Sequence, residues 1–129
     1  NSVTAANGNV TFNGTIDTVA TAAAEDLAVT AAGAAGGQVS IAGNAGQTNR
    51  LGTLTISNAA DSTVSGVIAG AGTNLVKQGN GELTLSGTNT YTGSTIVDAG
   101  TLMLGTTGSI GSSGASGTWA SGRALATLR

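Results

Sequence analysis

The sequence predicts an all-β domain in which short parallel strands stack as the successive coils of a β-solenoid. Three observations carry this prediction: a short strand motif that recurs along the chain, a very low aromatic content, and small residues between the strand motifs. With 129 residues, the chain is long enough for one domain with a moderate core. We therefore expect a single β-solenoid domain over residues 1–129, about five or six coils long.

The recurring motif is a glycine, one further residue, and then a triplet that places apolar residues at its first and third positions. Alternation of this kind puts the apolar side chains on one face of a strand. Strands this short cannot bury an apolar face alone, whereas stacked coils share one continuous core. The repetition therefore favours a solenoid over an antiparallel sandwich or barrel. The five copies begin at Gly8, Gly37, Gly52, Gly81 and Gly100.

Small residues between the strand motifs fit the narrow corners of a solenoid. The chain has 22 Gly and no Pro, and aromatic residues make up only 2%. Asn and Thr in such corners can form hydrogen-bonded ladders between coils, and Phe12 is expected to fill the core at a position equivalent to Ile41. No window shows a sustained helical period. Residues 21–26 and 123–129 could each form one helical turn.

Composition excludes several classes of function. The net charge is −2, and the basic residues are scattered along the chain. The sequence therefore lacks the cluster of positive charge that binds the phosphates of a nucleic acid. The absence of Cys excludes disulfides and thiolate metal sites. No apolar run approaches the roughly 20 residues that span a bilayer. Because the chain begins at Asn1 without Met or a signal peptide, we expect a processed or excised segment.

Catalytic chemistry has few candidates. Without His, a Ser-His-Asp triad cannot be built, and a Ser–Lys pair would have to use Lys77. Glycoside cleavage needs two carboxylates about 5–10 Å apart. Glu82 and Asp98, 16 residues apart, could lie on adjacent coils, but we expect turn residues that keep the coil soluble. The sequence predicts no catalytic site.

Metal sites are also not expected. Calcium-binding solenoids use a Gly-Gly-x-Gly-x-Asp repeat, and Gly36-Gly37 lacks the following Asp. Glu25-Asp26 is the only adjacent acidic pair, which is too little for a site with six oxygen ligands. We therefore expect no metal and no cofactor.

Residues 64–104 carry the most specific pattern in the chain. Four segments follow one another: Leu-x-Lys-x-Gly-x-Gly at 75–81, Leu-Thr-Leu-Ser-Gly at 83–87, Asn-Thr-Tyr-Thr-Gly at 89–93 and Ala-Gly-Thr-Leu at 99–102. This region resembles the autotransporter passenger-associated repeat. The resemblance implies a right-handed parallel β-helix that is exported across the bacterial outer membrane and displayed at, or released from, the cell surface. Residues 105–129 depart from the pattern and are expected to form an atypical end or cap.

Within the resemblance, the distinctive residues have structural roles. Lys77 is expected to be a solvated turn residue and Tyr91 a turn-packing residue rather than a sugar-binding aromatic. We therefore expect a structural surface solenoid, a stalk or adhesion scaffold without catalytic activity, with a host or neighbouring cell surface as a possible partner. A polysaccharide-binding or -cleaving β-helix is an alternative.

A further alternative follows from the two ends of a short solenoid. The first and last coils expose unpaired strand edges, which natural sheets protect with charge, Pro or bulges. The chain has no Pro, and its first ten residues include no charged side chain. The alternative is therefore a secreted subunit whose copies stack end to end into extracellular filaments.

Overall fold

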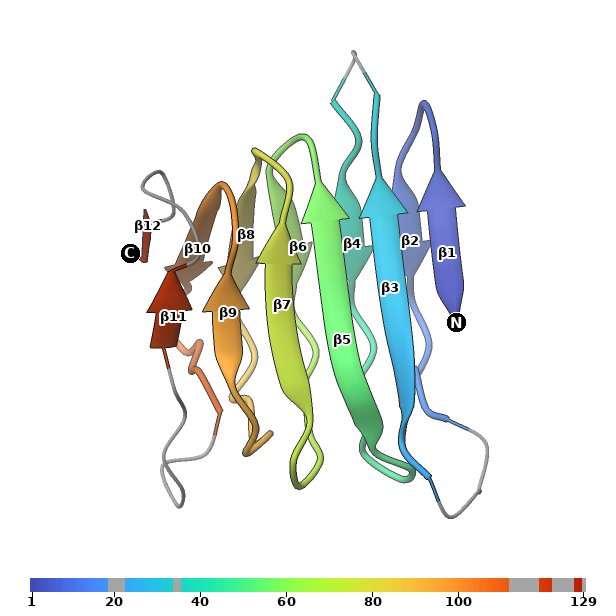
Figure 1. Cartoon of the computed structure of the whole chain (residues 1–129), viewed down its shortest axis with the longest axis vertical. Helices are drawn as coiled ribbons and strands as arrows, with labels where there is room; N and C mark the ends of the chain where they lie inside the picture. The colour runs from blue at the N-terminus through green and yellow to red at the C-terminus, as the bar shows by residue number, and fades with distance from the viewer. Residues whose placement is uncertain (19–22, 34–35, 112–118, 122–126, 129) are drawn as a thin grey trace.

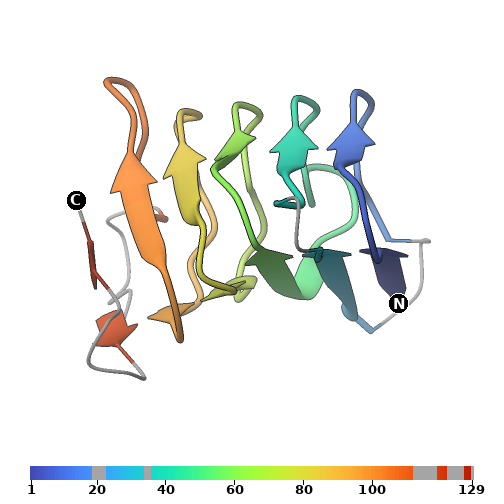
Figure 2. The same cartoon turned by 90° about the horizontal axis from the view of Figure 1, so that it is seen from above.

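A computed structural model describes residues 1–18, 23–33, 36–111, 119–121 and 127–128. The described strands form two parallel sheets of six strands each, which face one another (Figures 1 and 2). The front sheet of Figure 1 contains β1 (Ser2–Ala5), β3 (Glu25–Ala31), β5 (Leu51–Asn58), β7 (Asn74–Gln78), β9 (Thr95–Val97) and β11 (Trp119–Ser121). The back sheet contains β2 (Val10–Phe12), β4 (Val39–Ile41), β6 (Ser62–Val64), β8 (Glu82–Leu85), β10 (Thr101–Leu104) and β12 (Thr127–Leu128).

The chain alternates between the sheets, so each front strand is followed by a back strand (Figure 2). Every strand pairs in parallel with the strand two positions along the chain. Isolated parallel bridges from Ile16 to Ala45 and from Ala45 to Ile68 add a narrow third side. This is the coil-on-coil arrangement of a parallel β-solenoid, and the predicted fold class is confirmed. The right-handed sense of coiling, the number of coils and the single-domain boundaries stay predictions.

The coils differ in length: they shorten from β2 to β10 and lengthen again in the last described pair, where Thr101 pairs with Thr127. Val10 pairs with Val39, 29 residues later, whereas Thr84 pairs with Met103, 19 residues later. The recurring glycine motif also changes sheet: its copy at Gly52 lies within β5 of the front sheet, while the other four copies lead into strands of the back sheet. An alternating triplet fits either sheet equally well, since both bury one face. The irregular spacing of the copies follows from this change.

One continuous core runs through the coils. In the front sheet Val29 pairs with Ile56, and in the back sheet Leu83 pairs with Leu102; all four side chains are buried. Phe12 pairs with Ile41 as predicted, but it is only partly buried. The core residues are Val10, Val29, Ala31, Val39, Ile41, Ala45, Leu51, Leu54, Ile56, Val64, Ile68, Leu75, Leu83, Leu85, Tyr91, Val97 and Leu102.

The two helical turns expected from the sequence are not found where the structure describes those residues. Glu25 and Asp26 belong to β3, which pairs with β5, because Leu27 and Val29 extend the core from the same segment. Residues 127–128 form β12. The other positions of the two predicted turns are either residues 23–24, which are not helical, or lie outside the described residues. No helix in the described part of the chain is long and apolar enough to cross a membrane.

Glycines allow the coils to approach closely at one corner. Gly14, Gly43, Gly66 and Gly87 each follow a back-sheet strand by two residues and stand above one another in successive coils. A Cβ at position 43, 66 or 87 would lie within 1.9–2.2 Å of the carbonyl oxygen of the glycine below. Only glycine fits this contact, because real Cβ atoms do not approach an oxygen so closely.

Candidate functional site

Lys77 is a buried residue of β7, contrary to the expectation that it is a solvated turn residue. The alternation of the strand places it inward, in register with Ile56 and Val97 of the neighbouring coils. Its Nζ donates hydrogen bonds to the carbonyl oxygens of Gln78 at 2.5 Å, Gly79 at 2.8 Å and Ala99 at 3.3 Å. Burial lowers the pKa of Lys77 to about 8. The three hydrogen bonds of the Lys77 ammonium thus all go to main-chain carbonyl groups. None goes to a Ser hydroxyl, as a catalytic Ser–Lys pair would require.

Asn58 has a similar role one coil earlier, at the equivalent corner. It is buried, and its Nδ2 donates to the carbonyl oxygens of Ala60 at 2.7 Å and Glu82 at 2.9 Å. Among the described residues, none donates a hydrogen bond to its Oδ1. Inward-facing carbonyl groups of two successive corners are therefore satisfied by side-chain donors, an amide at one and an ammonium at the next.

Glu82 and Asp98, the two carboxylates considered for glycoside cleavage, lie on adjacent coils as the sequence suggested. Glu82 begins β8 in the back sheet, after the corner between β7 and β8, whereas Asp98 follows β9 in the front sheet and opens the corner of the next coil, between β9 and β10. Asp98 accepts a hydrogen bond from Gln78 Nε2 at 3.2 Å, and its main-chain N–H donates to the carbonyl of Lys77. Asp98 therefore ties two coils together at this corner.

The other acidic candidates are also engaged across coils. Glu25 accepts a hydrogen bond from Asn1 Nδ2 at 2.7 Å, and Asp26 accepts one from the main-chain N–H of Thr53 at 2.7 Å. Gly36 and Gly37 lie between β3 and β4. In the described part of the chain, no group of three or more His, Cys, Asp or Glu side chains could hold a metal ion.

Tyr91 is fully buried, and its packing role is as expected. Its hydroxyl is 2.6 Å from Thr95 Oγ1, so the polar end of the ring is satisfied inside the coil. Burial raises the pKa of Tyr91, opposed in part by the hydrogen bond to Thr95. The ring is therefore not available to stack on a sugar.

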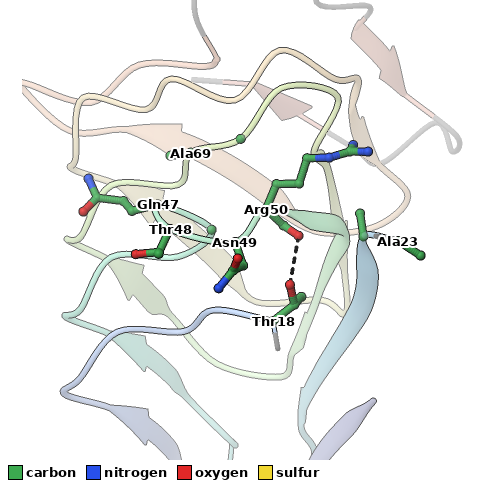
Figure 3. Close-up of a pocket in the computed structure, with 10 residues that line it drawn as sticks. Thr18, Ala23, Gln47, Thr48, Asn49, Arg50 and Ala69 are labelled. Carbon is green, nitrogen blue, oxygen red and sulfur yellow. Dashed lines mark hydrogen bonds between the residues drawn. The ribbon is translucent and has the colours of Figure 1, made fainter. Parts of the chain in front are cut away.

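A polar pocket of about 350 Å³ lies over the loop that joins β4 to β5 (Figure 3). Asp17 from the preceding coil shapes this loop, because its Oδ1 accepts hydrogen bonds from the N–H groups of Thr48 at 3.1 Å and Asn49 at 3.4 Å. The side chains do not converge: Gln47 and Arg50 extend to opposite sides in Figure 3. The pocket residues are Thr18, Ala23, Ala24, Gly46, Gln47, Thr48, Asn49, Arg50, Ala69 and Gly70.

Arg50 is the exposed cation of this region. Its Nη1 donates to the carbonyl of Ala71 at 3.0 Å, and its own carbonyl accepts from Thr18 Oγ1 at 3.3 Å. Sequence reasoning did not single out this pocket, since its residues belong to three coils that only the folded chain brings together. Its polar groups are Thr hydroxyls, Gln and Asn amides, main-chain groups and one guanidinium, and its lining residues include no acidic side chain or histidine that could activate a hydroxyl.

Comparison with known proteins agrees with this geometry. Residues 75–104 match the family model of the passenger-associated-transport-repeat. The chain is also 40% identical, over 83 residues, to the adhesin BmaC autotransporter of Brucella suis biovar 1 (strain 1330). That alignment covers 58% of this chain but only 2% of the relative. No solved structure shows a significant match.

The matched segment spans two neighbouring coils of the solenoid. It begins at Leu75 in β7 and ends at Leu104 in β10, so it contains two front strands and two back strands. Lys77, with all three of its carbonyl acceptors, lies within it. Residues 75–104, the segment that matches the passenger-associated-transport-repeat, form two stacked coils of a parallel β-solenoid.

Proposed function

We propose that the chain is a structural scaffold of a cell-surface autotransporter passenger, a stalk or adhesion support without catalytic activity. The observation that carries this proposal is that polar side chains form hydrogen bonds from one coil to the next. Lys77, Asn58 and Asp98 all bond to neighbouring coils, and each of these contacts joins one coil to the next. Polar side chains that form hydrogen bonds within the solenoid stabilise its coils, which suits a structural role.

The comparisons support the surface location. A passenger-type repeat implies export to the cell surface, and the curated relative is described as an autotransporter adhesin. Because the chain spans about 2% of that relative's length, the adhesive activity of the whole relative does not transfer to this segment by similarity alone. A solenoid grows by adding coils, and each coil contacts only its neighbours. A scaffold role fits one short segment of a very long surface protein.

The scaffold proposal predicts that coils can be added without loss of the fold. Because Thr84 pairs with Met103, residues 84–102 form one full coil, and a second copy inserted between positions 102 and 103 keeps every register. Two such copies should lengthen the solenoid by about 10 Å, at about 4.8 Å per coil. Small-angle scattering and thermal unfolding would measure the length and the stability.

The matched control inserts residues 84–92, about half a coil, at the same position. It should disrupt the strand register and lower the melting temperature. Equal melting temperatures for the two insertions would count against a modular scaffold. Beads coated with the chain separate a passive support from an adhesive one: a support gives no more attachment to host cells than beads coated with an unrelated soluble protein.

Self-association is a second candidate, favoured by the N-terminal edge. In the structure, β1 and β2 are the edge strands of the two sheets, and Val3 in β1 is the one large hydrophobic side chain of the described residues that is clearly exposed, at 38%. An exposed, uncharged strand edge is a template for another chain. The partner would be a second copy, stacked end to end.

Sedimentation and negative-stain microscopy at rising protein concentration test this candidate. Filaments or a concentration-dependent rise in mass are expected from the unmodified chain. Val3→Lys, which places a charge at the edge, should suppress them, while Thr63→Lys on the outer face of β6 should not. Monomers at every concentration would rule out self-association and leave the scaffold proposal standing.

A further inference from the structure

We propose that the corner that follows β7 contains a built-in binding site for a primary ammonium group, which the native chain fills with its own Lys77. This proposal goes beyond the scaffold function and does not depend on it. The site is the three carbonyl oxygens that accept hydrogen bonds from Nζ, those of Gln78, Gly79 and Ala99. It includes the buried space that holds the side-chain stem in register with Ile56 and Val97, which we call the channel. We call these three oxygens the carbonyl cradle.

The carbonyl cradle is assembled from two coils. Gln78 and Gly79 belong to the corner between β7 and β8, whereas Ala99 belongs to the corner between β9 and β10. Neither corner alone provides all three acceptors. The site is therefore complete only after the second coil has docked on the first, and Lys77 acts as a latch between the two coils of the repeat.

Glycines at the corner give the cradle its shape. Gly79 and Gly100 have positive φ angles, 77° and 70°, which turn the main-chain carbonyls of the corner toward the interior. A Cβ at position 100 would lie 3.0 Å from Lys77 Nζ and 2.4 Å from the carbonyl oxygen of Gly81. A larger residue at position 100 would thus crowd the ammonium and clash with the corner carbonyls of Gly79 and Gly81. The Lys-x-Gly element and the distant Gly100 serve one site.

The geometry of the cradle fits a primary ammonium group. A protonated amine has three N–H donors and no acceptor, and the cradle offers three acceptors and no donor. The hydrogen bonds of Nζ in the described structure go to main-chain carbonyls and not to a carboxylate. The head group is therefore held by directed N–H bonds, and the channel next to Ile56 and Val97 holds an unbranched alkyl stem. The ligand class is a short primary alkylammonium.

Chemical rescue tests the proposal. Lys77→Ala removes three methylene groups and the ammonium, which together are the atoms of n-propylammonium. An emptied interior site of this kind can bind a small molecule of the deleted shape, and a ligand that binds the folded state raises the melting temperature. We expect Lys77→Ala to unfold at a lower temperature than the unmodified chain and to be restored in part, with saturation, by n-propylammonium chloride.

Three controls distinguish specific binding of n-propylammonium from stabilisation by salt or by a small organic solute in general. Tetramethylammonium chloride at equal ionic strength has no N–H donor and should not rescue, and 1-propanol fills the channel without an ammonium and should rescue less. Lys77→Met keeps the stem, blocks the channel and should not respond to n-propylammonium. Rescue of Lys77→Ala by tetramethylammonium or propanol to the same extent as by n-propylammonium would overturn the proposal.

A second measurement needs no variant and decides the matter if Lys77→Ala fails to fold. Lys77 is the single lysine of the sequence, so the chain has only two kinds of amine, Lys77 Nζ and the α-amine of Asn1. The α-amine lies at the exposed N-terminus, where it donates to the carbonyl of Asp26. Reductive methylation followed by mass spectrometry should modify Lys77 at least about ten-fold more slowly than Asn1, since labelling requires the corner to open. Equal rates for the two amines would show that the cradle does not hold the ammonium.

Discussion

The carbonyl oxygen of Gly43 lies 2.1 Å from the point where a Cβ at position 66 would stand. Gly66 follows β6 by two residues, and Gly43 holds the same position one coil earlier after β4. The coils are in direct main-chain contact at this corner, and the space between them admits no side chain.

Gly66→Ala should therefore be strongly destabilising. The added methyl group has to push two coils apart, and overpacking against main chain costs about 3 kcal/mol or more. Gly14→Ala is the matched control, because Gly14 stands at the same corner but nothing lies within 4 Å of its added Cβ. It should change the free energy of unfolding by less than about 0.5 kcal/mol. Urea unfolding of both variants measures the difference, and similar values would contradict the close contact.

Asn89 joins three coils and gives a second prediction. Its Oδ1 accepts from the N–H of Ile68 at 2.8 Å in the coil before, and its Nδ2 donates to the carbonyl of Ser109 at 2.7 Å in the coil after. Asn89→Ala leaves both main-chain groups without this partner, and each buried unsatisfied group costs about 1–3 kcal/mol. We expect a loss of about 2–4 kcal/mol in the free energy of unfolding.

The neighbouring Thr88 provides the comparison for Asn89. Its side chain is exposed and makes one long hydrogen bond, 3.5 Å, to the carbonyl of Thr107. Thr88→Ala should cost less than about 0.5 kcal/mol. If thermal unfolding shows the two alanine variants to be equally stable, the Asn89 amide does not bridge the coils.

Much of the fold could be predicted because a solenoid coil is specified locally. The alternation in Val39-Ser40-Ile41 is enough to define which side chains face inward, and stacking needs only that each coil repeat this pattern. The sheet that each strand joins could not be predicted in the same way. Leu54-Thr55-Ile56 has the same alternation yet lies in the front sheet, since both sheets bury one face.

The role of Lys77 was predicted wrongly, and the reason is partly visible in the sequence. Lys77 is in phase with Leu75, two residues earlier, so strand alternation alone places it on the inward face. Its acceptors could not be foreseen from spacing, because the Ala99 carbonyl comes from the next coil, 22 residues further on. A lysine in an apolar phase is most simply interpreted as solvated until a set of main-chain acceptors is known to surround it.

The lowered pKa of Lys77 gives the chain a distinctive pH dependence. The folded pKa is about 8, below the ordinary 10.5, so between these values the unfolded chain holds a proton that the folded chain has released. Raising the pH through this window therefore disfavours unfolding, and stability should rise, by up to about 3 kcal/mol across the full interval. The raised pKa of buried Tyr91 acts in the opposite direction above pH 10, where the unfolded tyrosine ionises first. Urea unfolding between pH 7.5 and 9.5 isolates Lys77: the unmodified chain should gain stability relative to Lys77→Met, whose other titrating groups are the same. A constant difference between the two proteins across this range would mean that Lys77 keeps an ordinary pKa and that its ammonium is not buried.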